Sequence, residues 1–171
     1  VHGATVLSIL VVFWKEIVKL MKGVFRFTMN EEMVYALKII VSMIPVAIVG
    51  FTMRDKVEAL FVADMDITGS FLLVTALFLL VGHFVPKRDK PVTYGGAFLM
   101  GIAQALAVLP GVSRSGSTIS TGLMLGNSKN ELARFSFLMV IIPIIGANFM
   151  HVISTEPQAV NGVLFPLIIA F

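Results

Sequence analysis

The feature that most constrains this chain is a series of apolar runs, each close to the length needed to cross a bilayer. A hydrocarbon core about 30 Å thick requires about 20 residues of helix. Four runs meet or approach that length, and a fifth begins near the end of the chain: 1–20, 33–53, 67–85, 132–153 and Gly162 to Phe171. Only 13% of the 171 residues are charged, whereas soluble domains carry roughly 25%. We therefore predict an all-α, polytopic membrane protein with a single membrane domain over residues 1–171.

Composition excludes several other classes of protein. The chain has no cysteine, which excludes disulfides and cysteine-based metal sites. Its net charge of +3 lies in short loops between apolar runs, which indicates lipid headgroups as partners and no nucleic acid. The chain opens on Val1, inside an apolar run, and stops inside another one. We therefore expect it to be an internal fragment of a longer protein.

The segment 95–126 between the third and fourth long runs has a different pattern. It contains two apolar stretches, 95–109 and 116–126, that are each short for a membrane crossing. Pro110 and Gly111 separate them. Two half-helices that meet at a turn rich in glycine, proline and serine predict a re-entrant hairpin over 95–126. A single broken helix that crosses the membrane is the competing interpretation.

Loop charges favour the re-entrant hairpin. The loops predicted at 15–32 and 86–94 are basic, whereas the loop at 54–66 is rich in acids. Positive loops stay in the cytoplasm, so the two basic loops are predicted to lie there. A re-entrant 95–126 keeps Lys129 on the same side, and a single crossing would invert that assignment.

A charged residue stands at the break between the two half-helices. Ionisable residues within apolar membrane segments are costly and mark functional sites by default. The arginine fork suits phosphate, glycines allow backbone N–H groups to approach an anion, and a helix starting near Gly116 directs its positive end there. The residues of this candidate anion site are Gly111, Ser113, Arg114, Ser115, Gly116 and Thr118.

Arg114 and several polar residues near the break also have plainer interpretations. Arg114 could extend its side chain to a membrane interface. Ser117 and Ser120 suit close packing between helices equally well. Gln104, about two turns before the break, either forms an interhelical hydrogen bond or points into the site.

The sequence around the break also resembles a known family. The run GIAQALAVLPGVSRSGSTI over 101–119 is similar to the second signature of the bacterial undecaprenyl-diphosphate phosphatases, the bacitracin-resistance family. Further matches extend along nearly the whole chain in the order of the family, namely VLSILVVFWKEI, MIPVAIVG and ELARFSFLMVIIPIIGA.

The resemblance implies a function. The family hydrolyses undecaprenyl pyrophosphate to undecaprenyl phosphate and inorganic phosphate at the outer face of the bacterial cell membrane, which recycles the lipid for cell-wall synthesis and confers bacitracin resistance. It has two inverted repeats, each with a re-entrant hairpin, and it requires a divalent cation, Mg²⁺ or Ca²⁺. By this match Arg114 is the catalytic, pyrophosphate-binding residue, Ser113, Ser115 and Thr118 line the phosphate pocket, and Gln104 faces it.

One part of the family pattern has no match in this chain. The first signature, a glutamate-rich helix followed by a Pro-x-Ser-Ser-x-Gly-His turn, is missing. We therefore expect the metal ligands and the catalytic serine and histidine to lie outside this chain, which should be inactive alone. His2, His83 and His151 are expected to be structural, and Glu131 and Glu156 are predicted to lie in loops, where they are poor metal ligands.

Two other functional classes compete with a phosphatase, namely a transporter or flippase and a structural membrane subunit. Re-entrant half-helices also build substrate sites in secondary transporters, and a lipid flippase could use the same hairpin as a lipid-phosphate site. A purely structural membrane subunit leaves Arg114 unexplained. The expected partners are the polyprenyl pyrophosphate lipid and membrane lipids, with a homodimer left open.

Overall fold

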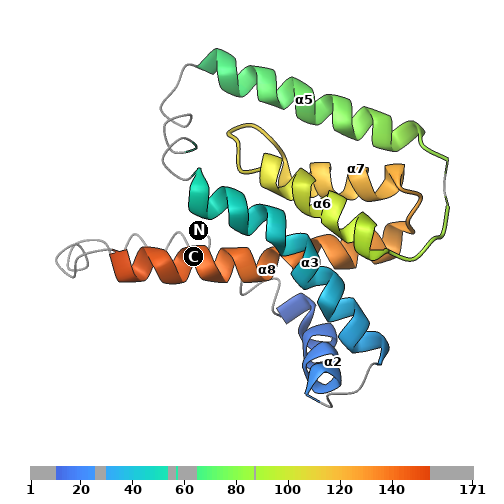
Figure 1. Ribbon diagram of the computed structural model, residues 1–171. Coiled ribbons are helices and arrows are strands. Elements are labelled where there is room, and N and C mark those ends of the chain that lie inside the picture. The colour runs from blue at the N-terminus through green and yellow to red at the C-terminus, as the bar shows by residue number, and fades with distance from the viewer. Residues whose placement is uncertain (1–10, 26–29, 54–56, 58–64, 87, 155–171) are drawn as a thin grey trace.

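A computed structural model describes residues 11–25, 30–53, 57, 65–86 and 88–154 of the chain. Over these residues the chain is helical, and its only β-type pairing there is an isolated bridge between Lys90 and Asn127. The six helices are α2 (Trp14–Val24), α3 (Glu31–Thr52), α5 (Met65–Phe84), α6 (Tyr94–Leu106), α7 (Arg114–Met124) and α8 (Lys129–Ser154) (Figure 1). The all-α prediction is confirmed for this part of the chain.

Helix α3 matches the predicted run 33–53 most closely. Asn30 caps it by accepting a hydrogen bond from the Met33 N–H at 2.8 Å, and the helix continues through Pro45 to Thr52. Among the described residues, it is the one helix that is long and apolar enough to cross a membrane.

The other predicted crossings have less support. Helices α5 and α6 contain shorter apolar stretches, Thr68–Phe84 and Tyr94–Leu106. Crossings at 67–85 and 132–153 therefore stay predictions. The run from Gly162 lies outside the described residues.

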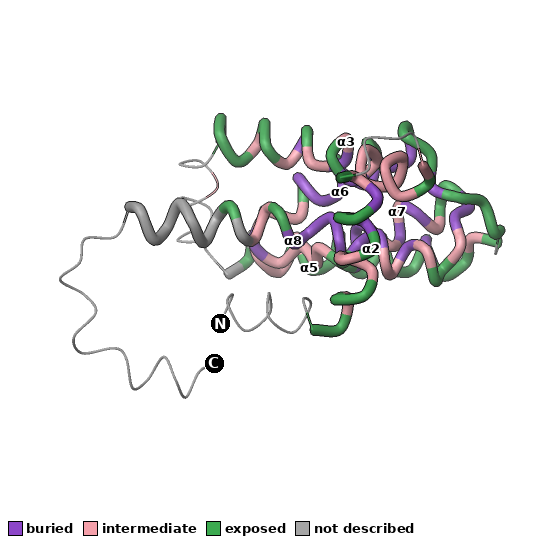
Figure 2. The backbone as a smooth tube through the Cα atoms, turned by 90° about the horizontal axis from the view of Figure 1, so that it is seen from below, coloured by how far each residue is buried: buried purple, intermediate pink, exposed green. Residues whose placement is uncertain are grey.

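The protein core lies where α3, α6 and α8 meet. Its largest fully buried side chains include Met100 of α6 and Leu132, Phe135 and Met139 of α8. Figure 2 shows the buried residues concentrated along these helices and α7, while α5 is largely exposed. The core thus joins α6, the first helix of the segment 95–126, to α3 and α8.

Two helices carry apolar faces that no other part of the described chain covers. Ile40, Ile44 and Ile48 are exposed at successive turns of α3. Leu73 and Leu77 are exposed on α5, which is apolar all round. Contiguous exposed apolar surface of this kind is unfavourable in water and indicates a lipid environment.

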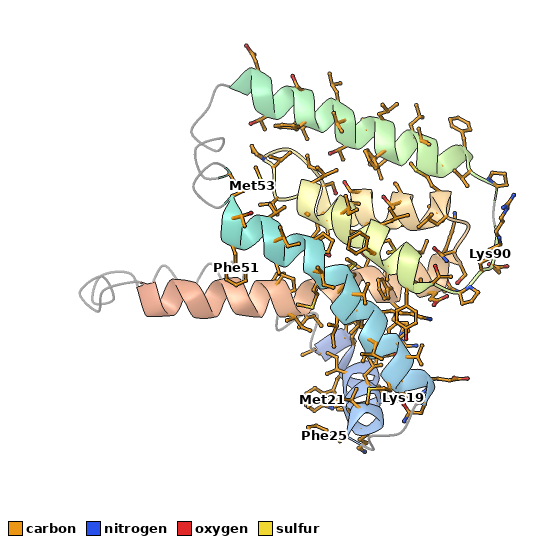
Figure 3. All side chains as sticks on the ribbon, in the orientation of Figure 1. Lys19, Met21, Phe25, Phe51, Met53 and Lys90 are labelled. Atoms are coloured by element: carbon orange, nitrogen blue, oxygen red, sulfur yellow. The ribbon has the colours of Figure 1, made fainter. Side chains whose placement is uncertain are left out.

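Residues 1–10 of the first predicted run, 1–20, lie outside the described residues, and its last part forms helix α2. This helix continues to Val24, so the predicted loop at 15–32 is wrong for its first part. The apolar residues of α2, among them Ile17 and Leu20, recur at helical spacing, so the lysines lie along the opposite face of an amphipathic helix. Lys19 pairs with Glu32 at the start of α3, with 3.3 Å between Nζ and Oε1. Figure 3 shows Lys19, Met21 and Phe25 at this end of the molecule. A long hydropathy window does not detect the end of this amphipathic helix.

Helices α6 and α7 form a hairpin whose two ends are joined. The Lys90 N–H donates to the Gly126 carbonyl at 3.1 Å, and the Ser128 N–H donates to the Lys90 carbonyl at 3.3 Å. The Asn127 side-chain amide adds bonds to the carbonyls of Lys90 and Pro91 at 3.2 and 2.9 Å. The chain therefore enters and leaves the hairpin at the same end, which we call the hairpin base.

The helices of the hairpin differ slightly from the predicted 95–109 and 116–126. Helix α6 ends at Leu106, because Pro110 disfavours helical backbone in the residue before it and the chain turns instead. Helix α7 begins at Arg114 because Ser113 caps it, not near Gly116. The connection 107–113 is the hairpin tip. It lies toward the end of α3 that carries Phe51 and Met53, whereas Lys90 lies at the opposite end (Figures 1 and 3).

Candidate phosphate-binding site

The hairpin tip requires glycine at one position. Gly111 has a φ of 88°, a left-handed conformation that side chains disfavour. A Cβ at this position would lie 2.5 Å from the carbonyl oxygen of Thr68 on α5. Gly111 therefore allows the tip both to turn and to lie directly against α5.

Ser113 starts the helix that follows the tip. Its backbone is extended, and its hydroxyl accepts a hydrogen bond from the Gly116 N–H at 3.2 Å. This is the standard serine N-cap, and it fixes the first turn of α7. The N–H of Ser117 bonds to the Ser113 carbonyl at 2.9 Å. Within the described residues the N–H groups of Arg114 and Ser115 have no acceptor, so they are available to an anion.

Arg114 is the first residue of α7 and is half-buried. The one ion pair in the described part of the chain joins Lys19 to Glu32, so Arg114 has no acidic partner there. A cation at a helix N-terminus is repelled by the helix dipole. An anion bound at the tip would be attracted to both the guanidinium and the helix.

A residue that sequence reasoning missed holds the tip in place. Thr75 of α5 is 6% exposed. Its hydroxyl accepts from the Ser113 N–H at 3.1 Å and lies 3.1 Å from the Gly111 carbonyl, to which it donates. In the sequence Thr75 is one of three hydroxyl residues in the apolar run 67–85, and only the packing of α5 against α7 places it at the tip.

Thr118 is fully buried between helices. Its hydroxyl lies 2.6 Å from the Ser136 hydroxyl of α8 and donates to the Arg114 carbonyl at 2.9 Å. Contact of Thr118 with phosphate stays a prediction, and in this structure its hydroxyl already has protein partners.

Two other polar side chains of the hairpin are buried with atoms that lack partners. Gln104 of α6 and Ser117 of α7 are each 2% exposed, and Gln104 Oε1 and Ser117 Oγ have no hydrogen-bond partner among the described residues. Ser120 packs against Gly82 of α5, where a Cβ would lie 2.8 Å from its hydroxyl. Ser115, in contrast, is exposed beside Arg114.

The described residues do not offer a metal site. Glu131 was expected in a loop, but it lies in the first turn of α8 and accepts a hydrogen bond from the Val92 N–H at 3.1 Å, at the hairpin base. His83 is exposed at the end of α5. No cluster of three histidine, aspartate or glutamate side chains occurs in the described part of the chain. His2 and Glu156 lie outside the described residues, and the side chain of His151 is not described.

Comparison with known proteins identifies the family of the whole chain. The chain is 47% identical to an undecaprenyl-diphosphatase of Bacteroides fragilis over 175 aligned residues, which cover 100% of this chain and 66% of the relative. It is 53% identical to an undecaprenyl-diphosphatase of Bacteroides thetaiotaomicron, covering 85% of this chain and 56% of the relative. For an undecaprenyl-diphosphatase of the archaeon Methanococcus vannielii the identity is 39%, with 90% and 62% covered.

The chain thus spans less than two thirds of the length of these relatives. The sequence profile described as bacitracin resistance protein BacA matches residues 1–171. This match extends over the whole chain, including the hairpin with its capped helix and its unpaired arginine. The chain belongs to the bacitracin resistance protein BacA family.

Proposed function

We propose that the protein containing this chain hydrolyses undecaprenyl pyrophosphate to undecaprenyl phosphate and inorganic phosphate. The observation that carries this proposal is the tip of the hairpin. There a half-buried arginine stands at a capped helix N-terminus, and within the described residues the arginine has no acidic partner and the first N–H groups of the helix have no acceptor. These are the groups that bind phosphate. Relatives that are 47% and 53% identical to this chain are named undecaprenyl-diphosphatases.

Each residue of the tip has a separate task in the proposed reaction. The Arg114 guanidinium binds the pyrophosphate and neutralises charge that develops on it, and the N–H groups of Arg114 and Ser115 donate to the phosphate oxygens. The exposed Ser115 hydroxyl adds a donor. Ser113 and Gly116 fix the first helical turn through their hydrogen bond. Phosphoryl transfer depends mainly on such positioning and charge stabilisation.

A divalent cation, Mg²⁺ or Ca²⁺, belongs to the proposal but not to the residues described above. The described part of the chain supplies arginine, hydroxyls and N–H groups, which bind anions and do not form a set of cation ligands. We place the acidic ligands and the catalytic serine and histidine outside the described residues. This chain would then provide the phosphate-binding half of a site and be inactive alone.

The hairpin is proposed to enter the bacterial cell membrane from the cytoplasm, with the site opening toward the outer face. Basic residues flank the hairpin base, among them Arg88, Lys90 and Lys129, and such residues stay in the cytoplasm. Helix α6, with 13 residues, is about 20 Å long. It would carry the tip into the membrane without crossing it. We place the hairpin in one of two inverted repeats, the arrangement expected from the family resemblance.

Phosphate release by the purified full-length protein tests the proposal. With Mg²⁺ or Ca²⁺ present, the wild-type protein should release phosphate from undecaprenyl pyrophosphate. Arg114→Lys should lower kcat/KM on the order of a hundredfold, because a point charge cannot replace the two-pronged contact of arginine with phosphate. Arg88→Lys, at an exposed arginine of the hairpin base, is the matched control and should stay within about twofold of wild type.

The same assay separates the alternatives. A wild-type protein that releases no phosphate with either cation is not a phosphatase. If that protein instead moved the lipid across a vesicle bilayer without cleaving it, the flippase would be the correct function. Equal loss of activity in Arg88→Lys and Arg114→Lys would remove the special role of the tip.

A further inference from the structure

We infer that Thr75 of α5 is a positioning residue for the phosphate site at the hairpin tip. This inference rests on the proposed function, which it deepens. Thr75 lies 36 and 38 positions before its two partners in the tip, Gly111 and Ser113. It therefore links two elements that are distant in the sequence.

The Thr75 hydroxyl bonds to both sides of the turn that precedes Arg114. Its oxygen accepts from the Ser113 N–H at 3.1 Å, and its hydrogen points to the Gly111 carbonyl, also at 3.1 Å. A hydroxyl has one hydrogen and two acceptor lone pairs, so this geometry uses it as donor and acceptor together. The Phe71 carbonyl, one turn earlier on α5 and also at 3.1 Å, shares the same hydrogen.

The tip has little else to hold this stretch of backbone. Within the turn itself, the Val112 N–H bonds to the Leu109 carbonyl at 3.2 Å. Among the described residues, the Ser113 N–H has no acceptor other than Thr75. Gly111 meanwhile lies in close contact with the Thr68 backbone of the same helix α5. Helix α5 thus serves as the surface on which the tip is held.

The consequence reaches the phosphate site through Ser113. This residue bonds to Thr75 through its backbone N–H and caps α7 through its side chain. Its position therefore sets both the direction of the first N–H groups of α7 and the starting point of the Arg114 side chain. A displacement of about 1 Å in such a group can cost a hundredfold in rate.

The simpler account is that Thr75 satisfies its own hydroxyl within an apolar helix, as threonines in membrane helices commonly do. Ser70, on the same helix, does only this and donates to the Asp66 carbonyl at 2.9 Å. Thr75 differs because it is buried and has two bonds to the tip. Ser70 is therefore a matched control for the loss of a hydroxyl from α5.

The experiment compares Thr75→Val, Thr75→Ser and Ser70→Ala in the full-length protein. Valine keeps the shape of threonine but removes both bonds, so kcat for phosphate release should fall about tenfold to a hundredfold while KM changes by less than about threefold. Thr75→Ser keeps the hydroxyl and should restore kcat to within about threefold of wild type. Ser70→Ala should match wild type.

Amide hydrogen exchange gives a readout that does not depend on activity. Thr75→Val should speed exchange of the Ser113 N–H at least tenfold, whereas Thr75→Ser and Ser70→Ala should leave it unchanged. Unchanged exchange and unchanged kcat in Thr75→Val would overturn the inference, as would faster exchange with unchanged kcat. Failure of Thr75→Ser to restore kcat would also overturn it, because the hydroxyl would then not be the active group.

The two proposals can fail separately. If the wild-type protein releases no phosphate, the proposed function fails. The role of Thr75 is then decided by exchange of the Ser113 N–H, which does not depend on activity. Faster exchange in Thr75→Val that is reversed in Thr75→Ser supports positioning of the tip, and equal exchange in all variants overturns it.

Discussion

Three cations in the described residues are half-buried, namely Lys38, Arg114 and Arg134. Lys38 lies over the ring of Tyr94 at 5.9 Å, and Arg134 lies over the ring of Tyr35 at 5.4 Å. Arg114 has no such ring or acidic partner within the described part of the chain. A partly desolvated cation without a partner is unfavourable, so a bound anion would stabilise Arg114 more than the other two.

A substitution at Gly111 tests the shape of the tip at the residue scale. Gly111→Ala should destabilise the protein by about 1–3 kcal/mol, because alanine disfavours positive φ and its Cβ would collide with the Thr68 carbonyl. Phosphate release should fall with it, because the tip would move away from α5. The unfolding free energy can be measured by SDS titration in detergent.

Gly95→Ala is the control for this prediction. Gly95 is an α6 glycine with no atom within 4 Å of an added Cβ, so this change should be neutral or slightly stabilising. Equal effects at the two glycines would contradict this account.

Helix α7 packs against its neighbours through small and polar residues. Ser120 fits against Gly82 of α5, and an added Cβ at Gly122 would collide with Leu132 of α8. Small residues allow helix backbones to approach closely where lipid removes the hydrophobic drive for association. The contact to α8 also includes a buried pair of hydroxyls, Thr118 and Ser136.

This pair gives a prediction at the scale of the element. Thr118→Val leaves the Ser136 hydroxyl buried without its partner and should cost about 1–3 kcal/mol of unfolding free energy. The double variant with Ser136→Ala removes both hydroxyls and should cost less than the sum of the two single changes. SDS titration of the four proteins measures the coupling, with Thr121→Val as a control on the same helix.

Activity of the same variants decides between packing and phosphate binding. If Thr118 only joins α7 to α8, then Ser136→Ala and Thr118→Val should lower activity to a similar extent. A large loss of activity that is confined to Thr118→Val would instead show that its hydroxyl acts at the site, through the substrate or through its bond to the Arg114 carbonyl.

The sequence predicts those elements whose signal is local. The apolar run gave α3, and the proline and glycine at 110 and 111 marked the turn between α6 and α7 to within a few residues. Arg114 could be singled out because a charge within an apolar stretch is readable in one dimension, whereas the cap formed by Ser113 was not predicted. Thr75 could not be found, because its meaning comes from packing against residues 36 and 38 positions away. The end of helix α2 was placed too early, at Leu20, because its last turn is amphipathic and the apolar run ends before it.

At the scale of the whole molecule, the base and the tip of the hairpin lie near the ends of different helices. Its base lies beside the start of α8, where Glu131 accepts from the Val92 N–H, and its tip lies toward the end of α3 that precedes the acid-rich segment 54–66. The end with Lys90 is basic, as the cytoplasmic side of a membrane protein should be.

Labelling of single cysteines tests this arrangement directly, and the chain has no cysteine of its own. Lys90 and Lys129 are exposed on either side of the hairpin, and the neighbouring backbone of the base is hydrogen-bonded. Lys90→Cys and Lys129→Cys, each in a cysteine-free full-length protein, should therefore react with a membrane-impermeant maleimide from the same side, in inverted vesicles and not in spheroplasts. Met53→Cys, at the opposite end of α3, should react only from the other side. A single crossing by 95–126 would place positions 90 and 129 on opposite faces of a core about 30 Å thick, so reaction of the two from opposite sides would rule out a re-entrant hairpin.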